Sequence, residues 1–378
     1  MNSKQRLMTA LNFGQPDIIP VAPHWWGDYK YEIADKNFWT DCWTDGLSIV
    51  PIYAAFYERF RPDWFHLSGG YLRQRRGHPA RDYHTERKGE RLFLVAPDGH
   101  RDEVLADETL ASGKATPLPD IDLTSHRAID EYLLEHEKIT AEEIIAAGYT
   151  DHAAEIVRRY GDDVFVAVNV GTPGMLVYAG ERGYVKSMLS LYDYPKGVKY
   201  LIQRRYELAL EQVRAFSQVG VHGWIISEDR AGADTVSPEM YKQFLYEADC
   251  VFFAEVKKLG MIPIVYFCGD VMPLLSYIRE SGVLGLMVEE SRKTFHLDVV
   301  EIARKLQGKV CLFGNVNTTD LIFRGTPEEI ELAVKLQISA SKIGPFVMAN
   351  GSPLVPGTPP ENVEALITAT HKWGQYPL

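Results

Sequence analysis

Eight short apolar runs recur along this chain of 378 residues, and their recurrence constrains the fold more than any other feature. Each run is rich in β-branched or other apolar side chains and ends in polar residues, and most are followed by a stretch long enough for a helix. The runs are Ile18–Pro23, Asp63–Leu67, Val164–Asn169, Gly223–Ser227, Pro263–Phe267, Leu284–Val288, Val310–Phe313 and Pro345–Ala349. Eight alternating units predict an α/β protein with a closed (β/α)8 barrel, a TIM barrel. A doubly wound open sheet is the alternative, but no G-x-G-x-x-G motif follows a run.

The widest gap between runs predicts an insertion into the barrel. Between the second and third runs, Arg91–Ala96 and Asp102–Leu105 flank an Asp-Gly pair, which is typical of a β-hairpin. Farther on, Asp130–Ala147 has a helical pattern. No linker-like stretch divides the chain. We therefore expect one barrel domain over residues 1–378, with an α+β insertion at residues 71–160 between the second and third strands.

The chain opens on a predicted amphipathic helix and not on a secretory leader. Ser3 is the expected N-cap, Leu7, Met8 and Leu11 fall at helical spacing, and Gly14 is expected to end the helix. No stretch reaches the ~18 consecutive apolar residues that a bilayer crossing needs. We expect a cytoplasmic protein with no membrane partner.

Charge and cysteine usage exclude several classes of function. The 51 acidic and 40 basic side chains give a net charge of −11, which argues against nucleic acid as the main partner. The cysteines Cys42, Cys250, Cys268 and Cys311 show no C-x-x-C spacing. A disulfide framework and a structural zinc knuckle are therefore not expected.

Polar residues follow the apolar runs, where a (β/α)8 barrel carries its active site. These candidates are His24, Trp25, Trp26, Asn169, Glu228, Asp229, Tyr266, Cys268, Glu289, Glu290, Asn315, Asn317 and Asn350. We expect them to converge on one mouth of the barrel. Two adjacent acids are costly to bury unless they are used or paired, so Glu228 and Asp229 stand out.

Several candidates also have a purely structural interpretation. Cys268, at the end of a buried strand, would serve equally well as a small core residue. His24, beside two tryptophans, would be a hydrogen-bonded packing histidine, and Asn317 would be a turn residue that bonds its own backbone.

A set of short motifs, in one order and at one spacing, relates the chain to a known family. The motifs are Lys4-Gln5-Arg6, Pro16–Pro20, Ile226–Asp229, Ser237–Glu239, Cys268–Asp270, Leu312–Asn317, Gly325–Glu329 and Thr358–Asn362. On these motifs the chain resembles the uroporphyrinogen decarboxylase-like superfamily, which includes corrinoid-dependent methyltransferases. The resemblance implies a (β/α)8 barrel.

The chain departs from uroporphyrinogen decarboxylase itself at two places. That branch carries an early Gln-Ala-Gly-Arg stretch and an aspartate after its second strand that holds the pyrrole nitrogens. The corresponding places here are His24–Asp28 and Phe65–Gly70, and they lack both features. Haem biosynthesis is therefore not the expected role.

The chain also departs from the thiol-methylating branch, which it resembles in its second half. That branch binds zinc through a His-x-Cys pair and a later cysteine. Here Tyr266 stands at the histidine position, Cys268 keeps its place, and Ser352 or a neighbour replaces the later cysteine. If a metal is bound, its expected ligands are Cys268 and an oxygen donor such as Glu228.

The remaining branch moves a methyl group from a small methylated donor, such as an ether, to a corrinoid (cobalamin). The chain lacks the Asp-x-His-x-x-Gly pattern of many corrinoid carriers, so the resemblance implies a separate corrinoid protein, with residues 71–160 as its docking rim. An alkoxide leaves poorly and needs an acid, for which Glu228, Asp229 and Tyr266 are the candidates. The expected substrate-binding residues are His24, Trp25, Trp26, Asn169, Glu289, Asn317 and Asn350, with the two tryptophans as an apolar wall.

Two other classes of function stay open. One is a decarboxylase or lyase acting on another small acid without a corrinoid. The other is a barrel that binds a ligand or subunit without catalysis. The sequence names neither the methyl donor nor the oligomeric state.

Overall fold

The structure is a computed structural model of the chain. It describes residues 1–25, 29–36, 47, 49–68, 82, 84–89, 91–104, 120–136, 139–169, 174, 183–228 and 230–377. Two candidate site residues, Trp26 and Asp229, lie outside the described residues, as does Cys42.

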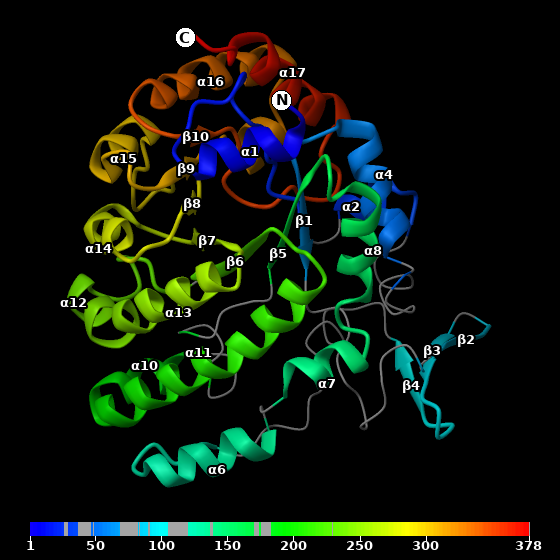
Figure 1. Cartoon of the computed structure of the whole chain (residues 1–378), viewed down its shortest axis with the longest axis vertical. Coiled ribbons are helices and arrows are strands. Elements are labelled where there is room, and N and C mark those ends of the chain that lie inside the picture. The colour runs from blue at the N-terminus through cyan, green and yellow to red at the C-terminus, as the bar shows by residue number, and fades with distance from the viewer. Residues whose placement is uncertain are drawn as a thin grey trace.

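A curled sheet of seven parallel strands forms the centre of the molecule (Figure 1). Its strands, in spatial and chain order, are β1 (Trp64–Ser68), β5 (Phe165–Asn169), β6 (Gly223–Glu228), β7 (Ile262–Phe267), β8 (Gly285–Val288), β9 (Cys311–Phe313) and β10 (Phe346–Val347). All but β1 are fully buried along their length, which is why they read as apolar runs. The predicted α/β class is confirmed, and seven of the eight predicted runs are strands.

The first run, residues 18–23, is not a strand, and the prediction of a strand there is wrong. It nevertheless bonds to both edges of the sheet. Val21 forms an isolated parallel bridge with Met348 after β10, and its carbonyl accepts a hydrogen bond from the Asp63 N–H, just before β1, at 2.8 Å. Pro20 and Pro23 supply no N–H for a regular ladder, which explains why only a bridge forms.

Most of the helices lie on the outer side of the sheet, between successive strands of the chain (Figure 1). The helices are α1 (Ser3–Leu11), α2 (Tyr29–Ile33), α4 (Val50–Phe60), α6 (His126–His136), α7 (Ala141–Ala146), α8 (Asp151–Tyr160), α10 (Tyr184–Asp193), α11 (Pro195–Gln218), α12 (Pro238–Tyr241), α13 (Glu247–Lys258), α14 (Leu275–Glu280), α15 (Val299–Leu306), α16 (Pro327–Ile338) and α17 (Pro360–Trp373). Among them, α6 and α7 pack against α11. Single π turns at Lys242–Tyr246 and Thr318–Ile322 and short 3₁₀ turns at Met272–Leu274 and Ser339–Lys342 complete the set.

Alternate strand residues fill the inside of the curled sheet. One buried cluster contains the inward-facing side chains, among them Trp64, Phe165, Ile225, Ile264, Tyr266, Met287 and Phe313. The intervening residues, such as Trp224 and Ile226 of β6, belong to a second cluster beneath the helices. Leu7 and Leu11 of α1 join the inner cluster. Helix α1 therefore closes the amino end of the sheet and leaves the carboxyl ends of the strands for a site.

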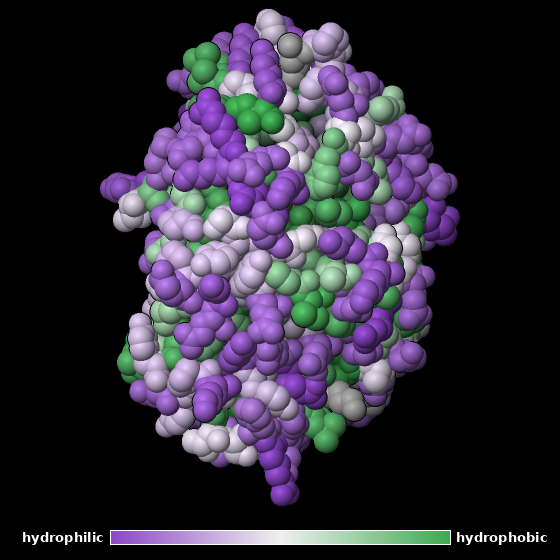
Figure 2. Space-filling view, turned by 60° about the vertical axis from the view of Figure 1, so that its left-hand side comes forward, coloured by the Kyte–Doolittle hydropathy of each residue, from purple (hydrophilic) through white to green (hydrophobic). Residues whose placement is uncertain are grey.

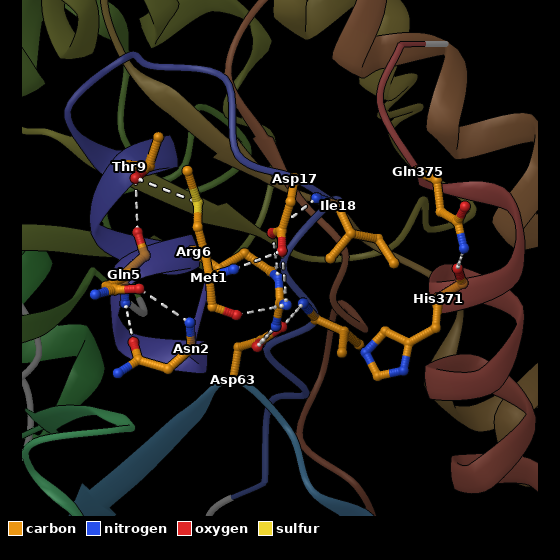
Figure 3. A network of polar contacts seen from close by, with 11 residues as sticks. Met1, Asn2, Gln5, Arg6, Thr9, Asp17, Ile18, Asp63, His371 and Gln375 are labelled. Atoms are coloured by element: carbon orange, nitrogen blue, oxygen red, sulfur yellow. Dashed lines mark hydrogen bonds and ion pairs between the residues drawn. The ribbon is translucent and has the colours of Figure 1, made fainter.

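An ion-pair network fixes α1 to the first run and to β1 (Figure 3). The guanidinium of Arg6 bonds Asp17 through Nε at 2.9 Å and Asp63 through Nη1 at 2.7 Å. The second carboxylate oxygen of Asp63 accepts a hydrogen bond from the Val21 N–H at 2.7 Å. Three segments far apart along the chain are thus joined through one buried carboxylate, that of Asp63.

The ends of α1 differ from the prediction. Asn2, not Ser3, is the N-cap: its side chain accepts from the Gln5 N–H, and the Gln5 side chain accepts from the Asn2 N–H. This capping box satisfies two N–H groups at once, which Ser3 as N-cap would not do. At the other end the helix stops at Asn12, because Phe13 adopts a left-handed conformation with φ of 63° before Gly14 is reached.

The predicted hairpin is confirmed as β3 (Arg91–Val95) and β4 (Arg101–Val104). A third strand, β2 (His84–Lys88), pairs with β3 and escaped prediction because its residues are all polar. The helical pattern at 130–147 resolves into two helices, α6 and α7, since Thr140 starts a new capping box.

Hydrophilic side chains cover most of the face shown in Figure 2, with apolar ones scattered between them. Within the described ranges, no helix has the length and apolar character to cross a membrane.

Candidate functional site

The polar residues that follow the strands meet at the end of the sheet opposite α1. Cys268 donates its N–H to the Glu228 carbonyl at 3.4 Å, which ties the ends of β6 and β7 together. Gly269 donates its N–H to the Glu289 carboxylate at 3.0 Å, which ties the end of β7 to that of β8. The structure thus brings Glu228, Cys268 and Glu289 to one end of the sheet.

Three of the predicted amides bond to neighbouring protein groups. Asn350 accepts from the His24 N–H at 2.8 Å and donates to the His24 and Ser352 carbonyls. Asn317 accepts from the Asp320 N–H and caps the following π turn. Asn169 donates to the Ser227 hydroxyl at 2.9 Å. Asn317 is thus a turn residue, which was the structural interpretation of this position. Asn350 joins the backbone at His24 to the backbone at Ser352.

The two acids after β8 are paired with the residues around them. Glu289 accepts from Arg292 Nη2 at 3.1 Å. Glu290 is buried, and its two oxygens accept from the N–H and the hydroxyl of Ser352 at 2.7 and 2.9 Å. Arg292 also donates to the Ser352 hydroxyl. Two carboxylates thus share one guanidinium on this side of the site, with Arg292 Nη2 3.1 Å from Glu289 and 3.8 Å from Glu290.

Two buried imidazoles lie inside the sheet just below this end. His24 stacks on His66 with ring centroids 5.1 Å apart and meets the edge of Tyr266 at 4.6 Å. His24 Nδ1 bonds the Gly351 carbonyl at 3.1 Å, while His24 Nε2 and both ring nitrogens of His66 have no hydrogen-bond partner among the described residues. His66 escaped prediction because it lies inside an apolar run. The feature that could have identified His66 is its position in β1, two residues after Trp64 and on the same inward-facing side of the strand.

Burial keeps both imidazoles neutral. It lowers the pKa of His24 to about 4 and the pKa of His66 well below its ordinary value. The bond to the Gly351 carbonyl then requires the proton of His24 on Nδ1. The imidazole of His24 thus presents an acceptor nitrogen, not a positive charge, to its surroundings.

A pH prediction follows for His24. As the pH falls from about 6.5 toward 4, the unfolded chain binds a proton at this residue that the folded chain does not, so stability falls with pH. We expect His24→Asn, whose amide can still donate to Gly351, to reduce this loss by about 1 kcal/mol per pH unit. Urea unfolding between about pH 7 and pH 5 measures it. Equal pH dependence in the two proteins would contradict the neutral state of His24.

Tyr266 lies next to the imidazole of His24, and Cys268 lies next to Tyr266. Burial raises the pKa of the Tyr266 phenol well above its ordinary value, and the neighbouring Cys268 and Glu289 raise it further. The phenol is therefore neutral and can donate a hydrogen bond toward the interior of the sheet.

Glu228 is fully buried at the end of β6 and faces the helices, not the interior of the sheet. Its place after Ser227 puts it on the same face of the strand as Ile226. Its Oε1 accepts from the Tyr206 hydroxyl of α11 at 3.1 Å. A methyl group at Gly174, in the segment after β5, would come within 3.2 Å of the same oxygen, so glycine allows that backbone to pass close to the carboxylate.

Trp25 lies in the hydrophobic core. Its indole is 1% exposed and stacks on Phe56 of α4 with ring centroids 3.7 Å apart. It also meets the edge of Tyr53. The aromatic neighbours of Trp25 thus include two residues of α4 and, at 6.3 Å, Phe65 of β1.

The residues present do not fit a zinc site. Among the residues that the structure describes, no group of three or more His, Cys, Asp and Glu side chains is arranged to hold a metal. Glu228 is directed at the helices, and Tyr266 offers only a neutral phenol in place of a soft ligand. The chemistry proposed for this chain therefore uses its own side chains and no zinc ion.

Comparisons with known proteins relate the chain to decarboxylases and methyltransferases. A family model described as uroporphyrinogen decarboxylase (URO-D) matches residues 125–373. Methylcobamide:CoM methyltransferase MtaA from Methanosarcina barkeri is 29% identical over 167 residues, which cover 44% of this chain and 46% of that protein. Uroporphyrinogen decarboxylase from Helicobacter pylori is 28% identical over 204 residues, which cover 52% of this chain and 55% of that protein. These matches span about half the length of the curated relatives.

One solved structure matches over almost the whole chain. A methyltransferase from Methanosarcina mazei aligns with a TM-score of 0.72 and 20% sequence identity, covering 98% of this chain and 99% of that one. At this identity the likeness shows a shared fold.

Proposed function

Because the chain belongs to the uroporphyrinogen decarboxylase (URO-D) family, we propose that it is a methyltransferase of this family that moves a methyl group from a small methylated donor to a corrinoid on a separate protein. The observation that carries the proposal is the set of acidic, phenolic and imidazole groups at the carboxyl ends of the strands. Relatives named as methyltransferases in both the sequence and the structure comparisons support it.

The poor fit to zinc favours a donor other than a thiol. The curated relative named above transfers a methyl group from methylcobamide to coenzyme M, as its name states. A thiol is activated as a thiolate when it binds a metal ion such as zinc that is held by sulfur and nitrogen ligands. This chain has Tyr266 at the histidine position of that branch, so we propose an ether-like donor instead.

The chain's own residues would bind the donor and supply a proton. The corrinoid, when bound, supplies the nucleophile for the methyl group. Glu228, at the carboxyl end of β6, is the proposed acid that protonates the leaving oxygen, and Tyr266, inside the sheet, is a neutral hydrogen-bond donor to another part of the methyl donor. His24 and His66 would present neutral nitrogens to a neutral donor. With buried side chains around them, these groups would exclude water from the reaction.

The proposal extends to the organisation of the protein. We infer one (β/α)8 barrel domain in which residues 18–23 take the place of the eighth strand, with an insertion at 71–160 that would dock the corrinoid protein. The separate three-stranded sheet β2-β3-β4 supports such an insertion. We place the protein in the cytoplasm.

The test is direct observation of methyl transfer. We expect the purified protein, mixed with reduced corrinoid free or on a carrier protein, to convert cob(I)alamin to methylcobalamin with at least one methylated ether or related compound. Visible absorption spectra follow the change. Donors without a methyl group on oxygen are the control.

A decarboxylase or lyase acting on another small acid is the second candidate. The match to curated uroporphyrinogen decarboxylases favours it. Release of carbon dioxide from a small acid, with no methyl donor changing the corrinoid spectrum, would replace the first proposal by this one.

A further inference from the structure

A buried cluster of two carboxyl groups and two phenols lies behind the end of β6. The Tyr206 hydroxyl of α11 is 3.1 Å from Glu228 Oε1 and 2.5 Å from Asp249 Oδ1 of α13. The Tyr241 hydroxyl of α12 donates to Asp249 Oδ2 at 2.6 Å. All four side chains are at least nine-tenths buried. The proposed function does not use Asp249, Tyr206 or Tyr241.

The hydrogens of these contacts favour one extra proton in the cluster. The Tyr206 hydroxyl has one hydrogen, yet it lies within hydrogen-bond distance of two carboxyl oxygens. If that hydrogen points to Glu228, Asp249 Oδ1 faces an oxygen lone pair, and the reverse holds if it points to Asp249. Either arrangement sets a phenol lone pair against a carboxylate oxygen at one of the two contacts, and a proton on one of the two carboxyl groups removes this repulsion.

The electrostatic surroundings agree with this count. Burial raises the pKa of Asp249 to about 6, and burial with the nearby Asp249 and Glu228 raises the pKa of both phenols. The groups with the largest effects here are the two carboxyl groups, the two phenols and the thiol of Cys250, each of which is neutral or negative. The folded chain therefore holds this proton at a pH where an ordinary aspartate has lost it.

We propose that Glu228 and Asp249 share one proton through Tyr206, so that Asp249 recharges Glu228 after each proton that Glu228 gives away. In the transfer, the proton on Asp249 Oδ1 moves to the Tyr206 oxygen while the Tyr206 hydrogen moves to Glu228 Oε1. Glu228 ends as the neutral acid and Asp249 as the anion, which the Tyr241 hydroxyl stabilises. Asp249 and Tyr206 are positioning residues, because they act through Glu228.

Two further features of the fold suit this role. The π turn at Lys242–Tyr246 separates Tyr241 from Asp249, and it lets two residues eight positions apart meet side by side. A groove of about 250 Å³ between α11 and α13 is lined by Tyr206 together with Gln203, Glu207 and Glu247. The groove approaches the cluster at the Tyr206 side chain, and it is the proposed route by which a proton returns to Asp249.

Infrared difference spectroscopy of the full chain tests the shared proton without any assay of activity. At about pH 5.5, above the ordinary pKa of aspartate and glutamate and below the raised pKa of Asp249, we expect wild type to show the carbonyl band of a protonated carboxyl group. Asp249→Asn and Glu228→Gln should each remove or shift this band, because the proton belongs to both groups. Tyr206→Phe should shift it. Glu255→Gln, a partly exposed acid of α13 paired with Lys258, should leave it unchanged.

The contrary results are equally definite. No such band in wild type, or a band that responds to only one of the two acids, would overturn the shared proton. Thermal melts identify any variant that fails to fold. If an acid variant does not fold, the infrared spectrum of Tyr206→Phe is the test, since this substitution removes one oxygen atom and no charge.

Turnover tests the second part of the inference, which rests on the proposed function. Asp249→Asn and Tyr206→Phe should lower kcat about 10-fold or more, leave KM within about twofold, and move the pH profile of kcat. Tyr246→Phe, a phenol that bonds Cys250, is the matched control. Unchanged kcat in both variants would overturn recharging through Asp249. A shared proton seen by infrared with no methyl transfer from any donor would contradict the proposed function alone.

Discussion

Glu228→Gln is expected to lower kcat about 10²-fold or more while the protein stays folded. The substitution keeps the shape of the side chain, and its amide can still bond the Tyr206 hydroxyl at the distance of 3.1 Å seen in wild type. It removes the ionisable proton that the leaving oxygen requires. Loss of a general acid typically costs 10²-fold to 10⁴-fold in rate. The measurement is kcat for methyl transfer to corrinoid, with circular dichroism and thermal melts as checks on folding.

The pH profile separates an acid from a packing residue. If Glu228 delivers a proton, the variant should lose the limb of the kcat profile that reports this group, and donors with better leaving groups should be less affected. Glu255→Gln is again the control, because that carboxylate is partly exposed and lies outside the groove. Wild-type turnover in folded Glu228→Gln would assign Glu228 to structure.

Asp63→Asn is expected to destabilise the protein by about 3 kcal/mol, the largest effect on stability that we predict. The Asp63 side chain is 1% exposed and accepts both an Arg6 guanidinium and the Val21 N–H at 2.7 Å. The amide replaces one acceptor oxygen by a donor, so one of these groups then faces another N–H. Breaking a buried ion pair from one side typically costs 3–5 kcal/mol.

Asp17→Asn is the matched control, since it removes the other carboxylate that bonds Arg6. Asp17 is 43% exposed, and solvent-exposed pairs contribute about 0–1 kcal/mol. Urea denaturation with equal slopes for the three proteins measures the difference. Equal losses of stability in the two variants would show that burial of Asp63 adds nothing to the network.

The strands could be predicted from the sequence because each is buried on both faces and therefore reads as an unbroken apolar run. Because every residue in such a strand is apolar, the sequence does not indicate which side chains point inward and which point toward the helices. Nothing in an all-apolar strand tells that Ile225 points inward, so the direction of Glu228 toward the helices could not be derived. Strand β2 was missed for the opposite reason, since it is polar throughout.

The partners of the site residues were beyond prediction. Tyr206 and Asp249 lie 22 and 21 residues from Glu228 along the chain, on helices whose exposed and buried faces only the packing defines. His66 was hidden inside an apolar run. The sequence predicts the end of the sheet at which the site lies. Which groups are neighbours there depends on how the helices pack.

The bridge between the first run and the far end of the chain has a consequence for how the protein reaches its native state. Val21 pairs with Met348, and Ile19 donates its N–H to the Gly374 carbonyl, so the residues around position 20 are completed by residues that are made much later. Until residues 346–374 have been synthesised, Leu7 and Leu11 have no closed interior to enter. Contacts this distant in sequence slow folding and prolong the exposure of apolar surface. Translation thus leaves a long interval in which the growing chain is open to aggregation and is a substrate for chaperones.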